Sequence, residues 1–366
     1  GAAVGDDALG HESAAGAGRR PGDDAASVGP GPAGGEAPGA EPSPSRRRLL
    51  IAATFAPLAA PQRLSAQPAF PSRPITLVVP FAAGGIADLT ARAVTRAMGE
   101  SLGQPFVVDN RPSAGAIVAG NQVLQARPDG HTLLLMSNAN AVSASLFRKL
   151  PFDATRDFQP ICTLGFFELA LVVAQDSRFR TLADLLADAK ARPGKLNIGT
   201  ISIGSTQHLA AELFKTRAGI DAQLVPYKAT PAVLTGLRGG EIDVAFEILG
   251  PLLPQLQSRA LRALAVTGGE RHPSLPDVPT VREAGIGDYD VASWNALAAP
   301  AGTPRDVIER LQRAARDAVA QPSVQQNLRQ LGVRALVGTP EQLQRLLADE
   351  IRRWGGVIRA AKIEPQ

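Results

Sequence analysis

80-PFAAGGIADLTARAV-94 places two glycines and a single acid between an apolar strand and a helix. The preceding residues 75–79, ITLVV, are apolar and mostly β-branched, which predicts a buried strand. The residues from Asp88 to Leu102 have the pattern of a helix. A glycine turn at this junction lets the backbone approach a phosphate, a carboxylate or another part of the chain. The free N–H groups and the dipole at the helix start would attract an anion.

A second strand-to-helix junction, 200-TISIGSTQHL-209, has the same features. Neither junction matches a phosphate loop, because neither contains GxGxxG or GxxxxGK[ST]. Each junction alone also fits an ordinary tight turn, and Asp88 alone also fits a residue that caps its own helix. If the two junctions face each other, they would suit a ligand with carboxylate groups.

Further polar side chains follow predicted strands, at the strand ends where α/β sheets bind ligands. The amide and hydroxyl groups could hydrogen-bond a ligand, whereas the charged groups fit solvated surface positions equally well. These residues are Ser137 and Asn138 after 132–136, Tyr227 and Lys228 after 223–226, and Glu247 after 243–246.

Ser205 and His208 lie three positions apart at the start of the second helix, close enough to suggest a nucleophile and its base. A serine nucleophile also needs an orienting acid and an oxyanion site, and the chain has no G-x-S-x-G elbow. His208 fits a packing or hydrogen-bonding role better, so we expect no catalysis at this pair.

Short apolar strands alternate with helical stretches from Pro74 onward, which predicts an α/β architecture with largely parallel sheets. Two amphipathic helices end the chain, with Thr303 and Thr339 as their expected N-caps. The expected strands are 75–79, 106–109, 132–136, 169–174, 195–199, 223–226, 243–246 and 261–267. The expected helices are 88–102, 116–126, 182–191, 206–218, 231–239, 304–320 and 340–361.

The chain has 366 residues, 45% of them hydrophobic and 20% charged, which is enough for two ordinary domains. Residues 1–44 are rich in Gly, Ala, Pro and Ser, so we expect them to be disordered or to lie upstream of the true start. Residues 45–66 combine three arginines, a short apolar run and a small-residue site, which predicts an export signal. Sec and twin-arginine export both stay open, and a disordered basic tail is the alternative interpretation.

The composition argues against several classes of protein. After residue 66 no Lys/Arg run forms a basic patch, and only 4% of the chain is aromatic, so we expect no nucleic-acid binding. The single cysteine, Cys162, excludes an internal disulfide, and its apolar neighbours predict a buried side chain rather than a nucleophile. The four histidines form no ligand-spaced pair with Cys or Glu, so we expect neither a metal nor a cofactor.

Many blocks of the chain, in order, resemble the Bug proteins, which are the substrate-binding components of tripartite tricarboxylate transporters (the TctC type). The resemblance covers almost everything from Phe70 to Ile363. The blocks are 70-FPSRPITLVVPFAAGGIAD-88, 102-LGQPFVVDNRPSAGA-116, 128-PDGHTLLL-135, 149-KLPFDATRDFQPI-161, 203-IGSTQHLAAELF-214, 225-VPYK-228, 261-LRALAVT-267, 275-LPDVPTVREAG-285, Ser293-Trp294, 299-APAGTP-304 and 338-GTPEQL-343.

The resemblance implies a type II-like periplasmic-binding-protein fold, in which two α/β lobes are joined by crossing strands and hold the ligand in a cleft. Lobe 1 would comprise residues 70–172 and 295–366, and lobe 2 residues 173–294. The segments 169–174 and 291–298 fall where crossing strands are expected. The family holds small carboxylates with backbone amides, hydroxyls and ordered water, often without an arginine.

The family's ligand-binding positions carry over to this chain with a few departures. Ala229 stands where the family often has Gly, Glu247 where an Asp is frequent, and 113-SAGA-116 carries less glycine than usual. Because Ala229 and Glu247 flank the expected cleft, the identity of the ligand is the family property that we expect to carry over least to this chain. The implied ligand-binding residues are Phe81, Gly84, Gly85, Asp88, Ser137, Asn138, Ser202, Gly204, Ser205, His208, Tyr227 and Glu247.

We therefore expect an exported, periplasmic, monomeric solute-binding protein without enzymatic activity. It would capture a small carboxylate, close its lobes by hinge motion and dock on membrane transport subunits. A ligand sensor that reports to a membrane sensor kinase is the first alternative, and a secreted hydrolase using Ser205 and His208 is the second. Because no deep basic pocket for a trianion is evident, the sequence favours a ligand with one or two carboxylates.

Overall fold

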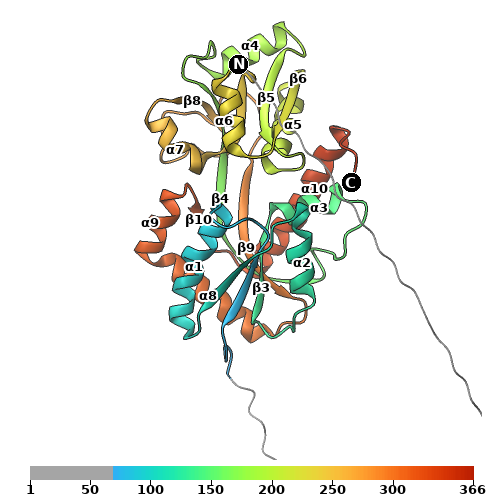
Figure 1. Ribbon diagram of the computed structural model, residues 1–366, viewed down its shortest axis with the longest axis vertical. Coiled ribbons are helices and arrows are strands. Elements are labelled where there is room, and N and C mark those ends of the chain that lie inside the picture. The colour runs from blue at the N-terminus through green and yellow to red at the C-terminus, as the bar shows by residue number, and fades with distance from the viewer. Residues whose placement is uncertain (1–68) are drawn as a thin grey trace, which may run out of the picture. The chain divides into compact units, whose positions relative to one another are not determined.

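The computed structural model describes residues 69–366 (Figure 1). The predicted export signal at 45–66 and the predicted disordered segment at 1–44 lie outside the described residues. No helix within 69–366 is long and apolar enough to span a bilayer.

The strands form one hydrogen-bonded path in the order β2-β1-β3-β9-β4-β7-β5-β6, and β8 and β10 also pair with β4. Parallel pairs join β1 to β2 and β3, and β5 to β6 and β7. The strands are β1 (Ile75–Val79), β2 (Phe106–Asn110), β3 (Thr132–Ser137), β4 (Phe158–Ala174), β5 (Leu196–Ile201), β6 (Ala222–Tyr227), β7 (Val244–Ile248), β8 (Leu261–Val266), β9 (Ala292–Pro300) and β10 (Arg334–Ala335).

The helices lie against both faces of these strands. Figure 1 shows α1, α8 and α9 on one side of β1 and β3, with α2, α3 and α10 on the other. The helices are α1 (Ile86–Leu102), α2 (Ile117–Leu124), α3 (Asn138–Leu146), α4 (Leu182–Ala191), α5 (Thr206–Ala218), α6 (Thr230–Arg238), α7 (Leu249–Gln257), α8 (Arg305–Ala320), α9 (Pro322–Gln330) and α10 (Pro340–Ala360).

Strand β3 shows why its sequence is apolar at nearly every position. Leu133 and Leu135 belong to the core on the α1 and α8 side, whereas Leu134 and Met136 belong to the core on the α3 and α10 side. Successive side chains of a strand point to opposite faces, so a strand covered by helices on both faces needs apolar residues throughout.

Strand β4 takes part in two groups of strands. Up to Glu168 it pairs antiparallel with β9, and from Leu169 onward it pairs antiparallel with β7 and β8. The prediction of largely parallel sheets is therefore wrong around β4 and β9, although it holds for β1–β3 and β5–β7. Register shifts at Pro160/Cys162 and Thr163/Gly165 interrupt the β4–β9 ladder. Such shifts break the regular alternation of side chains along a strand, so the first half of β4 was not predicted from the sequence.

Most of the other predicted elements are confirmed to within two residues. The cap at Thr339 is confirmed, because its side chain accepts a hydrogen bond from the backbone N–H of Gln342. The cap at Thr303 is wrong: Pro304 is the N-cap, and the hydroxyl of Thr303 donates to the carbonyl of Pro300 instead. Helices α3, α7 and α9 were not predicted.

Cys162 is fully buried in the apolar core, as predicted. Burial raises the pKa of its thiol to about 12, so the side chain stays protonated and unreactive at neutral pH.

Candidate ligand-binding site

A cavity of about 270 Å³ lies where several chain segments come together. Its lining comes from the starts of α1, α3 and α5, from the end of β7, and from β4 and β9. The carboxyl ends of β1, β3, β5 and β7 therefore meet at one place, which is the edge of an α/β sheet where ligands bind. The two glycine-bearing junctions of the sequence both contribute to this cavity.

The β1–α1 junction contributes Phe81, Gly85, Ile86 and Ala87 to the lining. Gly85 is the N-cap of α1, and no side chain caps the helix at this position. Ile86 and Ala87 are the first two residues of the helix, so their N–H groups are among those that an α-helix leaves without an internal partner.

Asp88 lies behind this junction and outside the cavity lining. Its buried carboxylate accepts hydrogen bonds from the N–H of Gly84 at 2.9 Å, from Nε of Arg92 at 2.9 Å and from Nδ2 of Asn110 at 2.9 Å. Burial alone would raise the pKa of Asp88, but these hydrogen bonds outweigh it and hold the pKa below its ordinary value. Asp88 thus supplies the loop with a fixed internal anion.

The β5–α5 junction contributes Ile201, Gly204, Ser205, Thr206 and Gln207 to the lining. Ser205 is the N-cap of α5, and its Oγ accepts a hydrogen bond from the backbone N–H of His208 at 3.1 Å. That cap leaves the N–H groups of Thr206 and Gln207, at the first two helical positions, for other acceptors.

Gly204 is needed at its position for two reasons. Its φ of +82° lies in the left-handed region, which L side chains rarely adopt. A Cβ added here would lie 2.3 Å from Cδ2 of Leu146 on α3, so the loop packs directly against that helix.

His208 is buried and lies outside the cavity lining. Burial, with a smaller contribution from Lys215, lowers the pKa of its imidazole to about 4, so the ring is neutral at neutral pH. The hydroxyl of Ser205 donates to the carbonyl of Ile201 at 3.3 Å rather than to the His208 ring. The hydrogen bond that would activate Ser205 as a nucleophile is therefore absent from the hydrogen bonds of these described residues.

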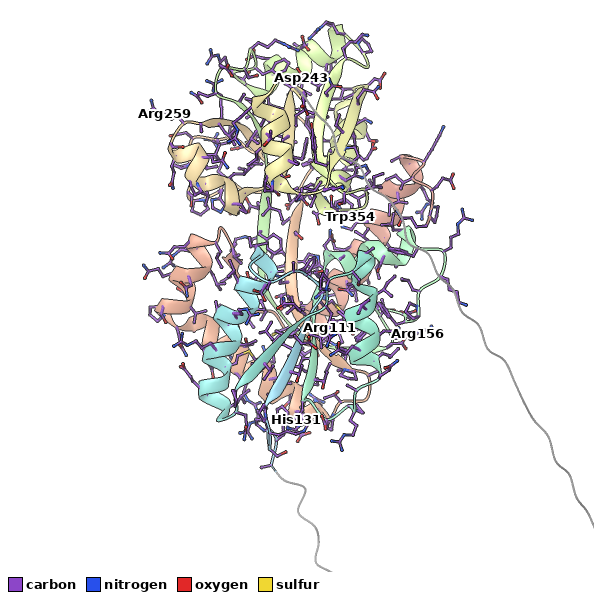
Figure 2. The ribbon with its side chains drawn as sticks, viewed as in Figure 1. Arg111, His131, Arg156, Asp243, Arg259 and Trp354 are labelled. Atoms are coloured by element: carbon purple, nitrogen blue, oxygen red, sulfur yellow. The ribbon has the colours of Figure 1, made fainter. Side chains whose placement is uncertain are left out.

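The start of α3 brings Ser137 into the lining and places Asn138 just behind it. Ser137 caps α3, because its Oγ accepts from the N–H of Ala139. Asn138 donates from Nδ2 to Oγ1 of Thr206 at 2.9 Å and accepts from Nε1 of Trp354 at 2.8 Å. These two hydrogen bonds link α10 to the start of α5 through Asn138. Figure 2 shows Trp354 on α10 beside this region.

Asn295 on β9 is one of the polar lining residues that the sequence interpretation missed, together with Thr206, Gln207 and Ser293. It is fully buried, lines the cavity, and has no hydrogen-bond partner at either Oδ1 or Nδ2. A buried amide without partners is costly unless another group fills its hydrogen-bonding capacity, which a ligand in the cavity can do. Its signal in the sequence is one amide within the apolar run 292-ASWNALAA-299.

Glu247 at the end of β7 is fully buried, so its interpretation as a solvated surface charge is wrong. Its Oε2 accepts from Oγ1 of Thr230 at 2.9 Å and from Nε2 of Gln207 at 3.3 Å. Burial raises the pKa of Glu247 and outweighs these hydrogen bonds. Glu247 is outside the lining and touches the site through Gln207, which does line it.

The remaining predicted residues lie away from the cavity lining. The hydroxyl of Tyr227 donates to Oε2 of Glu241 at 3.1 Å and sits over Gly236 of α6. Ser202 and Lys228 are exposed. Of the twelve predicted ligand-binding residues, the structure brings five together in the lining: Phe81, Gly85, Ser137, Gly204 and Ser205.

No residue of the lining carries a charged side chain. A ligand would meet the N–H groups at two helix starts, the hydroxyls of Ser137, Ser205 and Ser293, and the amides of Gln207 and Asn295. Such a set of groups can bind an anion by hydrogen bonds and helix dipoles without an ion pair.

Comparison with known proteins identifies the family and the fold. The family model described as "Tripartite tricarboxylate transporter family receptor" (TctC) matches residues 90–363. The structure of the periplasmic binding protein BugD is 30% identical, with a TM-score of 0.70, and the match covers 81% of this chain and 100% of that one.

Two solved structures with bound ligands are also similar. Rpa4515 of R. palustris, solved with adipate, is 34% identical, with a TM-score of 0.72 over 81% of this chain and 100% of that one. MatC of Rhodopseudomonas palustris, solved with bound malate, is 33% identical, with a TM-score of 0.68 over 79% of this chain and 100% of that one. These similarities show that the chain has the two-lobe fold of the periplasmic binding proteins. The chain belongs to the TctC family of solute-binding receptors, which includes the Bug proteins.

Proposed function

We propose that the protein is a periplasmic solute-binding protein that captures a small organic carboxylate and delivers it to the membrane subunits of a tripartite tricarboxylate-type transporter. The observation that carries this proposal is the convergence of two helix starts and the buried, unpartnered Asn295 on one uncharged cavity. The relatives solved with adipate and with malate support a carboxylate as the ligand class.

The carboxylate would accept hydrogen bonds from the N–H groups of Thr206 and Gln207 and from Nδ2 of Asn295. Hydrogen bonds to an ionised acceptor are stronger than neutral ones, and a buried cavity strengthens them further. The start of α1 already has the carboxylate of Asp88 behind it, so the ligand's charge would lie nearer α5. No bond of the ligand would be made or broken.

Capture would proceed by closure of two lobes. Lobe 1 would comprise residues 70–172 and 295–366, and lobe 2 residues 173–294. The change of partners along β4 between Glu168 and Leu169 supports a boundary near this point. The cavity also draws its lining from both proposed lobes, so closure would enclose the ligand. The closed form would then be the one that membrane subunits recognise.

Isothermal titration calorimetry of the full chain against mono-, di- and tricarboxylates tests this proposal. At least one acid should bind, and Asn295→Asp should weaken its affinity by about a hundredfold, because a buried carboxylate would repel the ligand. Asn327→Asp makes the same change at an exposed position of α9, away from the cavity, and should leave affinity unchanged.

Two outcomes would count against the proposal. If no acid binds to a protein that still unfolds cooperatively, the cavity does not serve small carboxylates. If the Asn295→Asp and Asn327→Asp variants lose affinity equally, the ligand binds elsewhere.

A further inference from the structure

We infer that Thr267 limits the range of angles between the two lobes, and that it thereby strengthens ligand binding without touching the ligand. This inference rests on the proposed function, because it takes the lobes to close around a ligand. Strands β4 and β9 run side by side (Figure 1) and carry the chain from one proposed lobe to the other. Thr267 directly follows β8 in lobe 2, and it is fully buried.

The hydroxyl of Thr267 joins the two crossing strands. Its Oγ1 accepts a hydrogen bond from the N–H of Leu169 on β4 at 2.9 Å and donates to the carbonyl of Val291, just before β9, at 2.7 Å. The backbone repeats both connections: the N–H of Thr267 donates to the carbonyl of Leu169 at 3.0 Å, and the N–H of Val291 donates to the carbonyl of Thr267 at 2.8 Å. A hydroxyl can bridge the strands because it both donates and accepts.

Thr267 is fixed to lobe 2 through its neighbour Val266. Val266 pairs with Ala170 on β4 and belongs to the buried apolar cluster on which α6 and α7 pack. Its N–H donates to the carbonyl of Pro279 at 3.0 Å, and its carbonyl accepts the N–H of Val281 at 3.0 Å. The crossing strands should therefore move with lobe 2 as far as their contacts with Thr267.

The side chain next to this point makes no comparable connection. Glu168 directly precedes Leu169 on β4 and pairs with Ala292 on β9. Its Oε2 is buried without a hydrogen-bond partner among residues 69–366, and its Oε1 lies 4.0 Å from Nε of Arg334, too far for a hydrogen bond. Bending of the crossing strands should therefore begin at the Glu168–Ala292 pair.

This pair adjoins the ligand cavity. The next pair of the β4–β9 ladder is Phe167 and Ser293, and both residues line the cavity. Oγ of Ser293 lies 3.4 Å from Oγ1 of Thr206 at the start of α5. A change of angle beside this pair would move it relative to α5. A hinge with few allowed angles leaves less motion for a ligand to arrest, which favours binding.

Thr163 provides a matched control, because its hydroxyl makes the same two kinds of hydrogen bond inside lobe 1. Its Oγ1 accepts from the N–H of Gly338 at 2.9 Å and donates to the carbonyl of Leu336 at 2.7 Å. Thr163 is also buried, and it lies on β4. Thr163→Val and Thr267→Val should therefore lower the free energy of unfolding by similar amounts, which urea unfolding would check.

The angle between the lobes can be measured with two spin labels on the full chain. Ser101→Cys on α1 and Ala187→Cys on α4 place one label at an exposed position of each lobe, and the buried Cys162 should stay unlabelled. Without any ligand, Thr267→Val should broaden the distance distribution from double electron–electron resonance by about half or more, whereas Thr163→Val should not. Thr267→Ser keeps the hydroxyl and should keep the wild-type width.

The effect on binding is measured with adipate and with malate, the acids bound in two relatives. In calorimetric titrations, Thr267→Val should weaken the affinity for an acid that binds the wild type by about fivefold. Thr163→Val and Thr267→Ser should change the affinity little.

The outcomes separate this inference from the proposed function. If Thr267→Val broadens the distances no more than Thr163→Val or Thr267→Ser, the inference is overturned while the proposed function stands. A broader distribution with unchanged affinity would overturn the link between Thr267 and binding. If no carboxylate binds, the proposed function fails, and the spin-label distances alone decide whether Thr267 limits the hinge.

Discussion

The β1–α1 and β5–α5 junctions read almost alike in the sequence, yet the structure uses them differently. The first carries its own anion, because the Asp88 carboxylate accepts the N–H of Gly84 and is held by Arg92 and Asn110. The second has no such carboxylate, and its titratable residue, His208, is kept neutral by burial. One junction therefore carries a fixed anion beside its helix start, which disfavours a second anion there, and the other carries none of its own.

The two junctions also differ in what surrounds their glycines. Gly84 and Gly204 have nearly the same φ, +81° and +82°. A Cβ on Gly84 would meet nothing within 4 Å, whereas a Cβ on Gly204 would collide with Leu146. The same backbone conformation therefore has open space beside it at Gly84 and a tightly packed neighbour at Gly204.

The largest expected effect is the difference in lost stability between alanine substitutions at these two glycines. Gly204→Ala should lower the free energy of unfolding by about 3 kcal/mol, from backbone strain and the collision with Leu146. Gly84→Ala, with strain alone, should cost about 1 kcal/mol. Urea unfolding would measure both, and the Gly204→Ala cost should shrink when Leu146→Ala is added. Equal losses of unfolding free energy in the two variants would contradict the difference in packing around the two glycines.

The next effect concerns pH and His208. Because the folded state lowers the pKa of this imidazole to about 4, its contribution to stability is complete above the unfolded pKa, about 6.5. It is lost as the pH falls from there toward 4, on the order of 3 kcal/mol in total. His208→Gln should flatten this part of the stability curve, measured by urea unfolding between pH 7 and 4.

His272→Gln provides a second, independent measurement of the same kind. Burial, with a smaller contribution from Arg334, lowers the pKa of His272 as well, so this variant removes a separate part of the same pH dependence. A stability curve that keeps its full slope in His208→Gln would contradict the assignment.

A somewhat smaller effect is expected at Asp88. Asp88→Asn removes the internal anion and should lower the free energy of unfolding by about 1.5 kcal/mol at pH 7. Since the folded state lowers the pKa of Asp88, this stability is present above the ordinary carboxyl pKa, about 3.9, and is lost as the pH falls through the folded value.

The difference between wild type and Asp88→Asn should therefore fade toward pH 3. Asp317→Asn, at an exposed residue of α8, is the control and should change stability little at any pH. A difference that persists at pH 3 would show that the charge is not what matters.

The smallest effect is expected at Glu247. Burial raises the pKa of this carboxyl, so its contribution to stability is present below the unfolded pKa and is lost as the pH rises through the folded value. Glu247→Gln should therefore stabilise the protein at pH 7, by about 1 kcal/mol. Thermal unfolding would show it, with the exposed Glu100→Gln as the control. A loss of stability would mean that the charge is needed behind Gln207.

Much of the fold could be read from the sequence because its signals are local. β-branched runs, helical periodicity and the cap at Thr339 placed most strands and helices correctly. Helix α3 escaped because it is made of polar and small residues with a weak apolar stripe, and α9 because it is short and buries only Val324 and Leu328. Antiparallel pairing across β4 and β9 depends on contacts distant in sequence, which no local pattern reveals.

The site was only partly predictable for the same reason. Glycines before helices identified the two junctions, but nothing local shows that Asp88 turns inward to Arg92 and Asn110 while Ser205 stays in the lining. Asn295 was missed because an amide within an apolar strand has no motif. Only the neighbouring strands show that its amide is both buried and unpartnered.

The positions of the tryptophans have a practical consequence for spectroscopy. The chain contains only two, Trp294 and Trp354. Trp294 stands between the lining residues Ser293 and Asn295, and Trp354 is joined through Asn138 to Thr206, which also lines the cavity. Both indoles are fully buried. The tryptophan fluorescence therefore contains no contribution from an exposed indole. Its intensity or wavelength should change when a ligand binds in the cavity, without any added label.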